Sequence, residues 1–138
     1  MENLNTSNQR VLFAVQGKWK DEIPDTGVYL YVHVRDVAEA TVAAFERDEA
    51  VNKRFFICGG RFSNKKIVDI IKKNFPEFND IVSNSTPGGD YPEGGVYGYN
   101  NKRSVELLGI KYRGLEESIV DVVKSLKAAG LQSSSAKL

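Results

Sequence analysis

The residue types that most often catalyse reactions or bind metals are scarce in this sequence of 138 residues. His33 is the only histidine and Cys58 the only cysteine, so the chain can form neither an internal disulfide nor a cluster of histidine and cysteine ligands. A histidine without a metal partner or a nearby nucleophile is more often structural than catalytic. The sequence therefore predicts no metal site, a structural His33 and an inert Cys58 thiol in the core.

Four lysines, Lys65, Lys66, Lys72 and Lys73, could serve an unrelated small nucleotide- or RNA-binding α/β domain. Against this reading, 19 basic residues face 18 acidic ones, and no aromatic residues alternate with these lysines. No stretch approaches the roughly 20 apolar residues of a membrane-spanning helix, and the first seven residues lack the basic and apolar parts of a secretion signal. We expect neither nucleic acid nor a membrane as partner, and a cytoplasmic location.

Two apolar runs predict β-strands on either side of a helix. Residues 28–34 are a nearly continuous run of β-favouring residues, typical of a strand that is covered on both faces. Residues 54–58 form the second run, which two glycines close. Between them, Asp36 is expected to cap a helix over about residues 37–46, with Glu39 completing a capping box. Strand, helix and strand in this order predict a βαβ unit with parallel strands.

The rest of the chain predicts four more helices and one long loop. A helix follows Asn5 and stops before Gly17, another begins at Ser63, and two more span Lys102–Leu108 and residues 115–129. Residues 83–100, rich in glycine and proline, are expected to be irregular. Two strands are too few for a covered parallel sheet, so the fold class is α/β with an incomplete sheet, whose missing part lies upstream.

One segment carries a family resemblance. Residues 31–45, YVHVRDVAEATVAAF, follow the pattern aromatic-x-x-V-R-D-V-A-x-A, which resembles the second half of extended short-chain dehydrogenases/reductases. Residues 4–7, 53–57, 74–76 and 101–109 fall in the family's order. The fungal branch with NADPH-dependent methylglyoxal and other carbonyl reductases is most similar, and plant dihydroflavonol and cinnamoyl-CoA reductases are more distant. The resemblance covers about residues 4–129.

The resemblance implies that residues 1–130 are the C-terminal, substrate-side part of a Rossmann-type reductase, followed by a disordered tail over 131–138. Such reductases hold NADP on a glycine-rich loop and use a Tyr-x-x-x-Lys pair to protonate the carbonyl. None of the six tyrosines has lysine four residues later. Tyr31 with Arg35 and Tyr99 with Arg103 have the right spacing, but we expect both to be incidental, and we predict no catalytic residue.

Ser7 is the one site residue that the resemblance carries over, as a contact to the phosphates of the cofactor. The equally weighted alternative is that Ser7 or its neighbours cap the first helix. The family's arginine and aspartate pair, Arg35 and Asp36, is expected to be structural, with Arg35 bound to a carboxylate.

Two functions follow from the resemblance. The favoured one is a fragment of an NADPH-dependent reductase of ketones or aldehydes, which supplies walls around a small carbonyl substrate and one cofactor-phosphate contact but is itself inactive. The alternative is a non-catalytic binding or dimerisation module derived from such a reductase. Because the strand over residues 28–34 lacks a cover, we expect either self-association or association with the N-terminal half of a reductase.

The C-terminal tripeptide gives a first testable prediction. Residues 136–138, Ala-Lys-Leu, resemble the Ser-Lys-Leu type of peroxisomal address. If they act as one, a fluorescent protein that carries residues 132–138 at its C-terminus will become punctate and colocalise with a peroxisomal marker. Diffuse fluorescence would leave only the cytoplasmic location.

Overall fold

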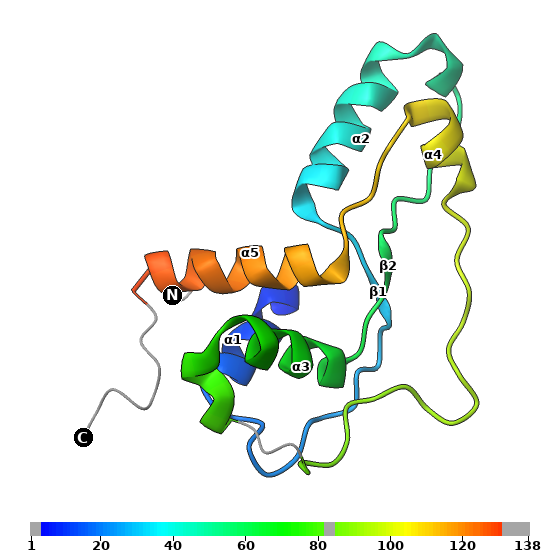
Figure 1. Cartoon of the computed structure of the whole chain (residues 1–138). Helices are drawn as coiled ribbons and strands as arrows, with labels where there is room; N and C mark the ends of the chain where they lie inside the picture. The colour runs from blue at the N-terminus through cyan, green and yellow to red at the C-terminus, as the bar shows by residue number, and fades with distance from the viewer. Residues whose placement is uncertain (1–3, 82–84, 131–138) are drawn as a thin grey trace.

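A computed structural model describes residues 4–81 and 85–130, which form two lobes (Figure 1). The lobes are joined by the strands β1 and β2 and by the segments before and after α4. In Figure 1, α1, α3 and α5 lie together below, α2 and α4 stand above, and β1 and β2 run between them. The elements are α1 (Thr6–Val15), β1 (Leu30–Tyr31), α2 (Val34–Glu46), η1 (Asp48–Ala50), β2 (Gly60–Arg61), α3 (Asn64–Asn74), η2 (Pro76–Ile81), α4 (Lys102–Leu108) and α5 (Leu115–Ala128).

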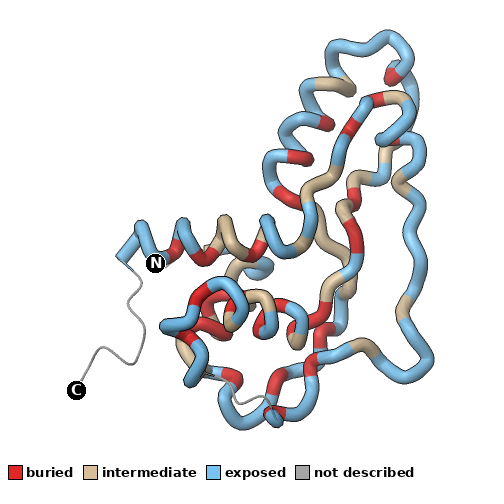
Figure 2. The backbone as a smooth tube through the Cα atoms, viewed as in Figure 1, coloured by how far each residue is buried: buried red, intermediate tan, exposed pale blue. Residues whose placement is uncertain are grey.

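The helical lobe, made of α1, α3, η2 and α5, contains the main hydrophobic core. Each of the three α-helices presents apolar residues at three- and four-residue intervals, so one side of each helix faces the other two. Figure 2 shows buried residues concentrated where these helices face one another. The core includes Val15, Ile71, Phe78 and Val123, all almost fully buried. Trp19, whose placement the sequence left open, is also part of this core.

The upper lobe, made of α2, η1, the segment 54–58 and α4 with the residues that follow it, has a much smaller core. The buried residues of this core are Ala40, Ala50, Leu108 and Ile110. Phe55, Ile57 and Tyr112 pack against them from the side and are only partly buried. The upper lobe therefore buries little apolar surface of its own.

The starts of α1 and α3 and the end of α4 agree with their sequence signals. Asn5 caps α1 by accepting a hydrogen bond from the Asn8 N–H at 2.9 Å, and Ser63 caps α3 by accepting one from the Lys66 N–H at 3.1 Å. Gly109, which ends α4, has a φ of 68°, a left-handed conformation that glycine adopts easily. The predictions of α1, α3, α4 and α5 are confirmed.

The predicted parallel pairing of the two strands is wrong. β1 pairs with β2 in antiparallel register, Leu30 opposite Arg61 and Tyr31 opposite Gly60. The apolar run over residues 28–34 is not one buried strand, because Val28 is exposed and α2 already begins at Val34. Residues 54–58 belong to neither strand. Strand propensity expresses packing against a neighbour. In this chain Gly60 and Arg61 provide a neighbour only for Leu30 and Tyr31.

The predicted capping role of Asp36 is also wrong. The helix begins three residues earlier than expected, and His33 caps it instead, since its Nδ1 accepts a hydrogen bond from the Arg35 N–H at 3.1 Å. Asp36 lies inside the first turn and is fully buried, which frees its carboxylate for a contact described below.

Residues 85–100 are irregular, as predicted, but their first part is tightly held. Gly88 forms an isolated parallel bridge with Ile23, and the Gly89 carbonyl accepts hydrogen bonds from the Lys65 N–H at 2.9 Å and from the Thr26 hydroxyl at 3.0 Å. Residues 82–84 and the predicted tail, 131–138, lie outside the described residues. Among the described helices, none is both long and apolar enough to cross a membrane.

Gly89 and Gly95 provide a matched test of this packing. Both have positive φ, 71° and 75°, but a Cβ on Gly89 would lie 2.1 Å from Ile23 Cγ2, whereas one on Gly95 would meet open space. Gly95→Ala should cost only the left-handed strain of about 1 kcal/mol. Gly89→Ala should lower the free energy of unfolding by about 2 kcal/mol more, because overpacking is added. Urea unfolding of both variants measures the difference, and equal losses would contradict the described packing.

Candidate functional site

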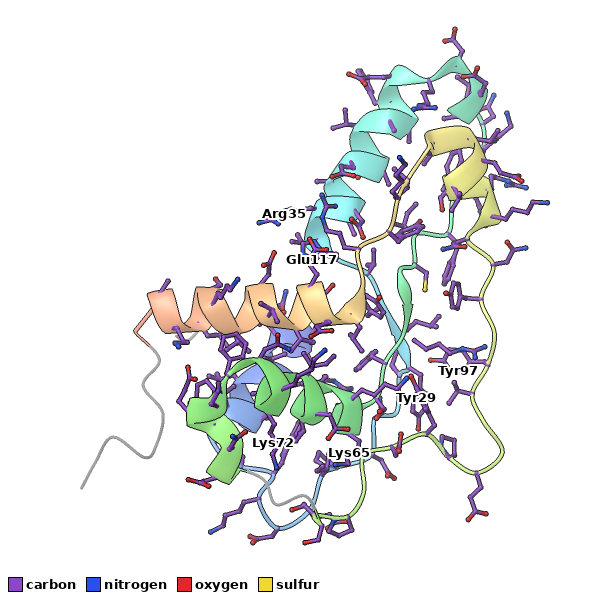
Figure 3. The ribbon with its side chains drawn as sticks, in the orientation of Figure 1. Tyr29, Arg35, Lys65, Lys72, Tyr97 and Glu117 are labelled. Atoms are coloured by element: carbon purple, nitrogen blue, oxygen red, sulfur yellow. The ribbon has the colours of Figure 1, made fainter. Side chains whose placement is uncertain are left out.

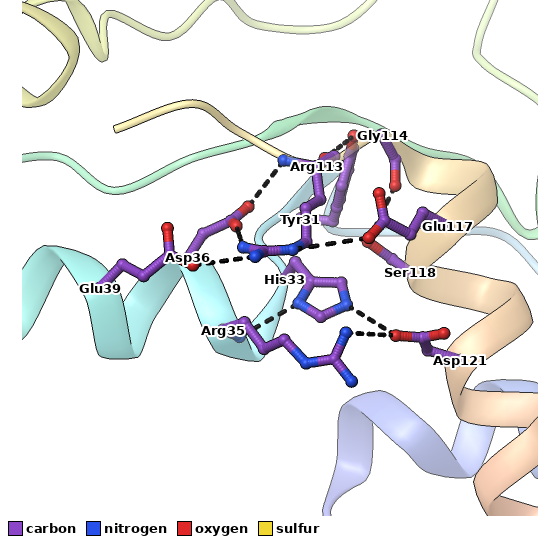
Figure 4. Close-up of polar contacts among 10 residues, drawn as sticks. All are labelled: Tyr31, His33, Arg35, Asp36, Glu39, Arg113, Gly114, Glu117, Ser118 and Asp121. Carbon is purple, nitrogen blue, oxygen red and sulfur yellow. Dashed lines mark hydrogen bonds and ion pairs between the residues drawn. The ribbon is translucent and has the colours of Figure 1, made fainter. Parts of the chain in front are cut away.

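A buried carboxylate anchors the junction between the two lobes (Figure 4). Asp36, at the start of α2, accepts a hydrogen bond from the Arg113 backbone N–H at 2.9 Å and forms an ion pair with the Arg113 guanidinium. The same guanidinium contacts Glu39 at 2.8 Å and Glu117 at 3.5 Å. The carboxylates of Glu39 and Asp36 raise the pKa of Arg113. This residue therefore stays cationic and joins α2 to the beginning of α5.

His33 and Arg35 strengthen the same junction through Asp121 of α5. Arg35 Nη1 lies 3.0 Å and His33 Nε2 lies 3.5 Å from the Asp121 carboxylate. With Nδ1 of His33 accepting the Arg35 N–H, both ring nitrogens of this buried histidine face polar partners. The histidine thus has the structural role that the sequence predicts, and Arg35 binds a carboxylate as expected.

In both tyrosine–arginine pairs with the Tyr-x-x-x-Lys spacing, the arginine binds another group. The Tyr31 hydroxyl donates a hydrogen bond to the Arg113 carbonyl at 3.2 Å, while Arg35 reaches Asp121 instead. Burial, followed by the nearby Tyr99, raises the pKa of Tyr31, which is opposite to the shift that a neighbouring cation would cause. Arg103 donates to the Arg54 carbonyl at 3.0 Å.

The Cys58 thiol is buried and has a raised pKa because of its burial. Its sulfur donates a hydrogen bond to the Gly60 carbonyl at 3.6 Å. A buried thiol whose pKa is raised carries little thiolate and is therefore a poor nucleophile. No group of three or more histidine, cysteine, aspartate or glutamate side chains that could hold a metal ion occurs within the described residues.

Ser7 lies exposed in the first turn of α1. The neighbouring residue Asn5 caps this helix, so Ser7 itself is not the cap. The Ser7 hydroxyl makes no hydrogen bond to any described residue. A hydroxyl at a helix start, beside the positive end of the helix dipole, is well suited to a phosphate. Its predicted contact to the cofactor stays a prediction.

The start of α3 resembles a phosphate-binding turn, which the sequence reading missed. Gly59 and Gly60 connect an extended segment to this helix, but the Tyr31 ring packs on both glycines. A Cβ added to Gly59 or Gly60 would lie 3.2 Å or 3.0 Å from this ring. The first N–H groups of α3 are also taken. They donate to the Thr26 hydroxyl, to the Gly89 carbonyl and to the Ser63 hydroxyl at 2.9, 2.9 and 3.1 Å. These residues therefore do not fit the pyrophosphate of a dinucleotide.

Two open hollows lie beside these elements. One, of about 320 Å³, lies between the loop at Asp25 and the loop that carries Asp90 and Tyr91. Tyr29 lines it, and Figure 3 shows Tyr29 next to Tyr97, whose hydroxyl accepts a hydrogen bond from the Tyr29 N–H at 3.0 Å. The other, of about 260 Å³, lies against α1. The sequence could not predict either, because loops distant in the chain create them.

The junction predicts a clear ranking of two carboxylate substitutions. Asp36→Ala should lower the free energy of unfolding by about 3 kcal/mol, since it removes a buried partner and leaves the Arg113 cation less compensated. Glu39→Ala, which removes a half-exposed carboxylate from the same guanidinium, should cost less than about 1 kcal/mol. Thermal or urea unfolding of the two variants compares them. A Glu39 effect as large as that of Asp36 would show that burial of Asp36 does not set the strength of the junction.

Sequence comparison finds relatives for nearly the whole chain, although no family model matches it. A ketoreductase of Aspergillus niger is 39% identical over 127 residues, which are 91% of this chain and 37% of the relative. The NADPH-dependent methylglyoxal reductase of Saccharomyces cerevisiae is 31% identical over 126 residues, 91% of this chain and 36% of the relative. The chain thus spans little more than a third of the length of these relatives.

Structural comparison agrees with the sequence. The crystal structure of yeast methylglyoxal/isovaleraldehyde reductase with NADPH matches 94% of this chain and 38% of its own, with a TM-score of 0.78 and 32% identity. The antiparallel pairing of β1 and β2 therefore does not conflict with the family resemblance. By sequence and by fold, the chain is similar to the C-terminal part of fungal reductases that include a ketoreductase and an NADPH-dependent methylglyoxal reductase.

Proposed function

We propose that the chain is the substrate-side part of an NADPH-dependent reductase of ketones or aldehydes. In this role it supplies walls around a small carbonyl substrate and, through Ser7, one contact to the phosphates of NADP. The observation that carries the proposal is the match of almost the whole chain to one end of a reductase structure that contains NADPH. The proposed location is the cytoplasm, with the peroxisome as the alternative.

The geometry of Ser7 supports the cofactor contact. Its hydroxyl is exposed and uncommitted among the described residues, and the cap of α1 is already supplied by Asn5. A phosphate at this position would gain the hydroxyl donor and the positive end of the helix dipole.

We infer that this chain does not reduce carbonyl compounds alone. Tyr31 is committed to the Arg113 carbonyl, and the N–H groups at the start of α3 already have protein partners. Hydride transfer and protonation would then depend on residues of the reductase outside this sequence. The second candidate function, a non-catalytic binding or dimerisation module, is favoured by one observation, which is the exposed apolar surface of α2.

A chimeric reductase tests the proposal. The purified 138-residue chain should consume no NADPH with methylglyoxal or simple aldehydes, because it lacks a Tyr-x-x-x-Lys pair. A chimera in which this chain replaces the matching part of the Aspergillus niger ketoreductase should regain NADPH-dependent reduction. Ser7→Ala in the chimera should raise the Kd for NADPH about tenfold, in line with the loss of a hydrogen bond to a charged group.

Ser118→Ala is the matched control, because the Ser118 hydroxyl only donates to the Gly114 carbonyl of its own helix. Turnover by the verified isolated chain would contradict the proposed division of labour. A soluble, folded chimera without turnover would instead favour the non-catalytic module.

A further inference from the structure

The His33 side chain joins two helices through its two ring nitrogens (Figure 4). Nδ1 accepts the Arg35 N–H at 3.1 Å and thereby caps α2, while Nε2 faces the Asp121 carboxylate of α5 at 3.5 Å. His33 is only 5% exposed. One buried side chain therefore contacts both lobes of the chain.

These two partners determine which nitrogen of the neutral ring carries the proton. Nδ1 faces an N–H donor and must be the acceptor, whereas Nε2 faces a carboxylate, which when ionised only accepts hydrogen bonds. The neutral ring of His33 thus carries its proton on Nε2. A second proton can be added only at Nδ1, which is the atom that caps the helix.

The α2 cap differs in chemistry from the other side-chain caps of the described helices. Asn5 caps α1 and Ser63 caps α3, and neither side chain titrates. The Ser63 hydroxyl accepts the Lys66 N–H at 3.1 Å, the same distance as in the α2 cap. The charge of a histidine ordinarily changes between about pH 5 and 8. Among these caps, only that of α2 can therefore be lost by protonation.

The charged groups around the ring act differently on its two contacts. Asp121 of α5 attracts a protonated ring, although Arg35 shares this carboxylate at 3.0 Å. The positive end of the α2 dipole opposes a cation at the start of this helix. The other titratable side chains near the junction have partners of their own, which are Asp36, Glu39 and Glu117 for Arg113, the Arg113 carbonyl for Tyr31 of β1, and Thr26 and Asn64 for Arg10 of α1. A proton on the ring thus weakens its contact to α2 and favours its contact to α5.

We propose that His33 is a pH-sensitive cap, which releases the start of α2 when it becomes protonated. Nε2 carries a proton in both forms of the ring, so the contact to Asp121 persists. Nδ1 changes from an acceptor into a donor, so the Arg35 N–H loses its partner. Acidification therefore loosens the first turn of α2, which also carries Asp36, and leaves the caps of α1 and α3 intact.

Amide exchange of the full chain, measured by NMR at about pH 8 and about pH 5 and corrected for the intrinsic pH dependence of exchange, tests the proposal. Protection of the Arg35 amide should fall about fivefold at the lower pH, in line with the loss of a helix cap. The Lys66 amide, whose acceptor does not titrate, is the control within the same molecule and should keep its protection. Ring nitrogen shifts should show the Nε2–H form at the higher pH and the imidazolium at the lower.

Two variants separate the cap from other effects of acid. His33→Asn supplies an acceptor that does not titrate, so the Arg35 amide should have the same protection at both pH values. His33→Ala supplies no acceptor, so this protection should be reduced at both. If His33→Asn shows the same loss in acid as the original chain, a group such as Asp121 causes the loss and the inference is wrong.

The original chain decides the question even if neither variant folds. An imidazolium that leaves the Arg35 protection unchanged would show that the cap does not respond to the proton. A neutral ring with its proton on Nδ1, or a ring that is still neutral at about pH 5, would overturn the inference equally.

Discussion

The buried carboxylate of Asp36 determines how the two lobes are arranged. A charge without solvent access is costly unless it is paired and hydrogen-bonded, and Asp36 receives both its hydrogen bond and its counter-charge from Arg113. Arg113 directly precedes the turn into α5, so this contact fixes α5 of the helical lobe to α2 of the upper lobe. The strands β1 and β2, with two residues each, are too short to fix this arrangement alone.

The sequence predicted the helices well because their signals are local. Capping by Ser63, termination at Gly109 and the apolar spacing in α5 depend on residues within a few positions. The strands depend on partners elsewhere, and here local propensity misled. Residues 28–34 look like one buried strand, yet the chain offers a neighbour only to Leu30–Tyr31, and the start of α2 uses the remaining residues.

The candidate site shows the same limit. The sequence shows directly that a Tyr-x-x-x-Lys pair is absent and that Ser7 lies at a helix start, since both features depend on nearby positions. The sequence could not show that the first N–H groups of α3 already donate hydrogen bonds, because their acceptors, Thr26 and Gly89, lie in loops far away in the chain. The burial of Asp36 was equally hidden, since its partner Arg113 lies 77 residues later.

The two lobes have hydrophobic cores of unequal size. Three helices and η2 enclose residues such as Phe78 and Val123 without help, so the helical lobe has the core of a small domain. The upper lobe has few buried apolar residues and an apolar stripe that faces outward. Since hydrophobic stabilisation grows with the area removed from water, a partner on the upper lobe would add the most stability where the chain has least.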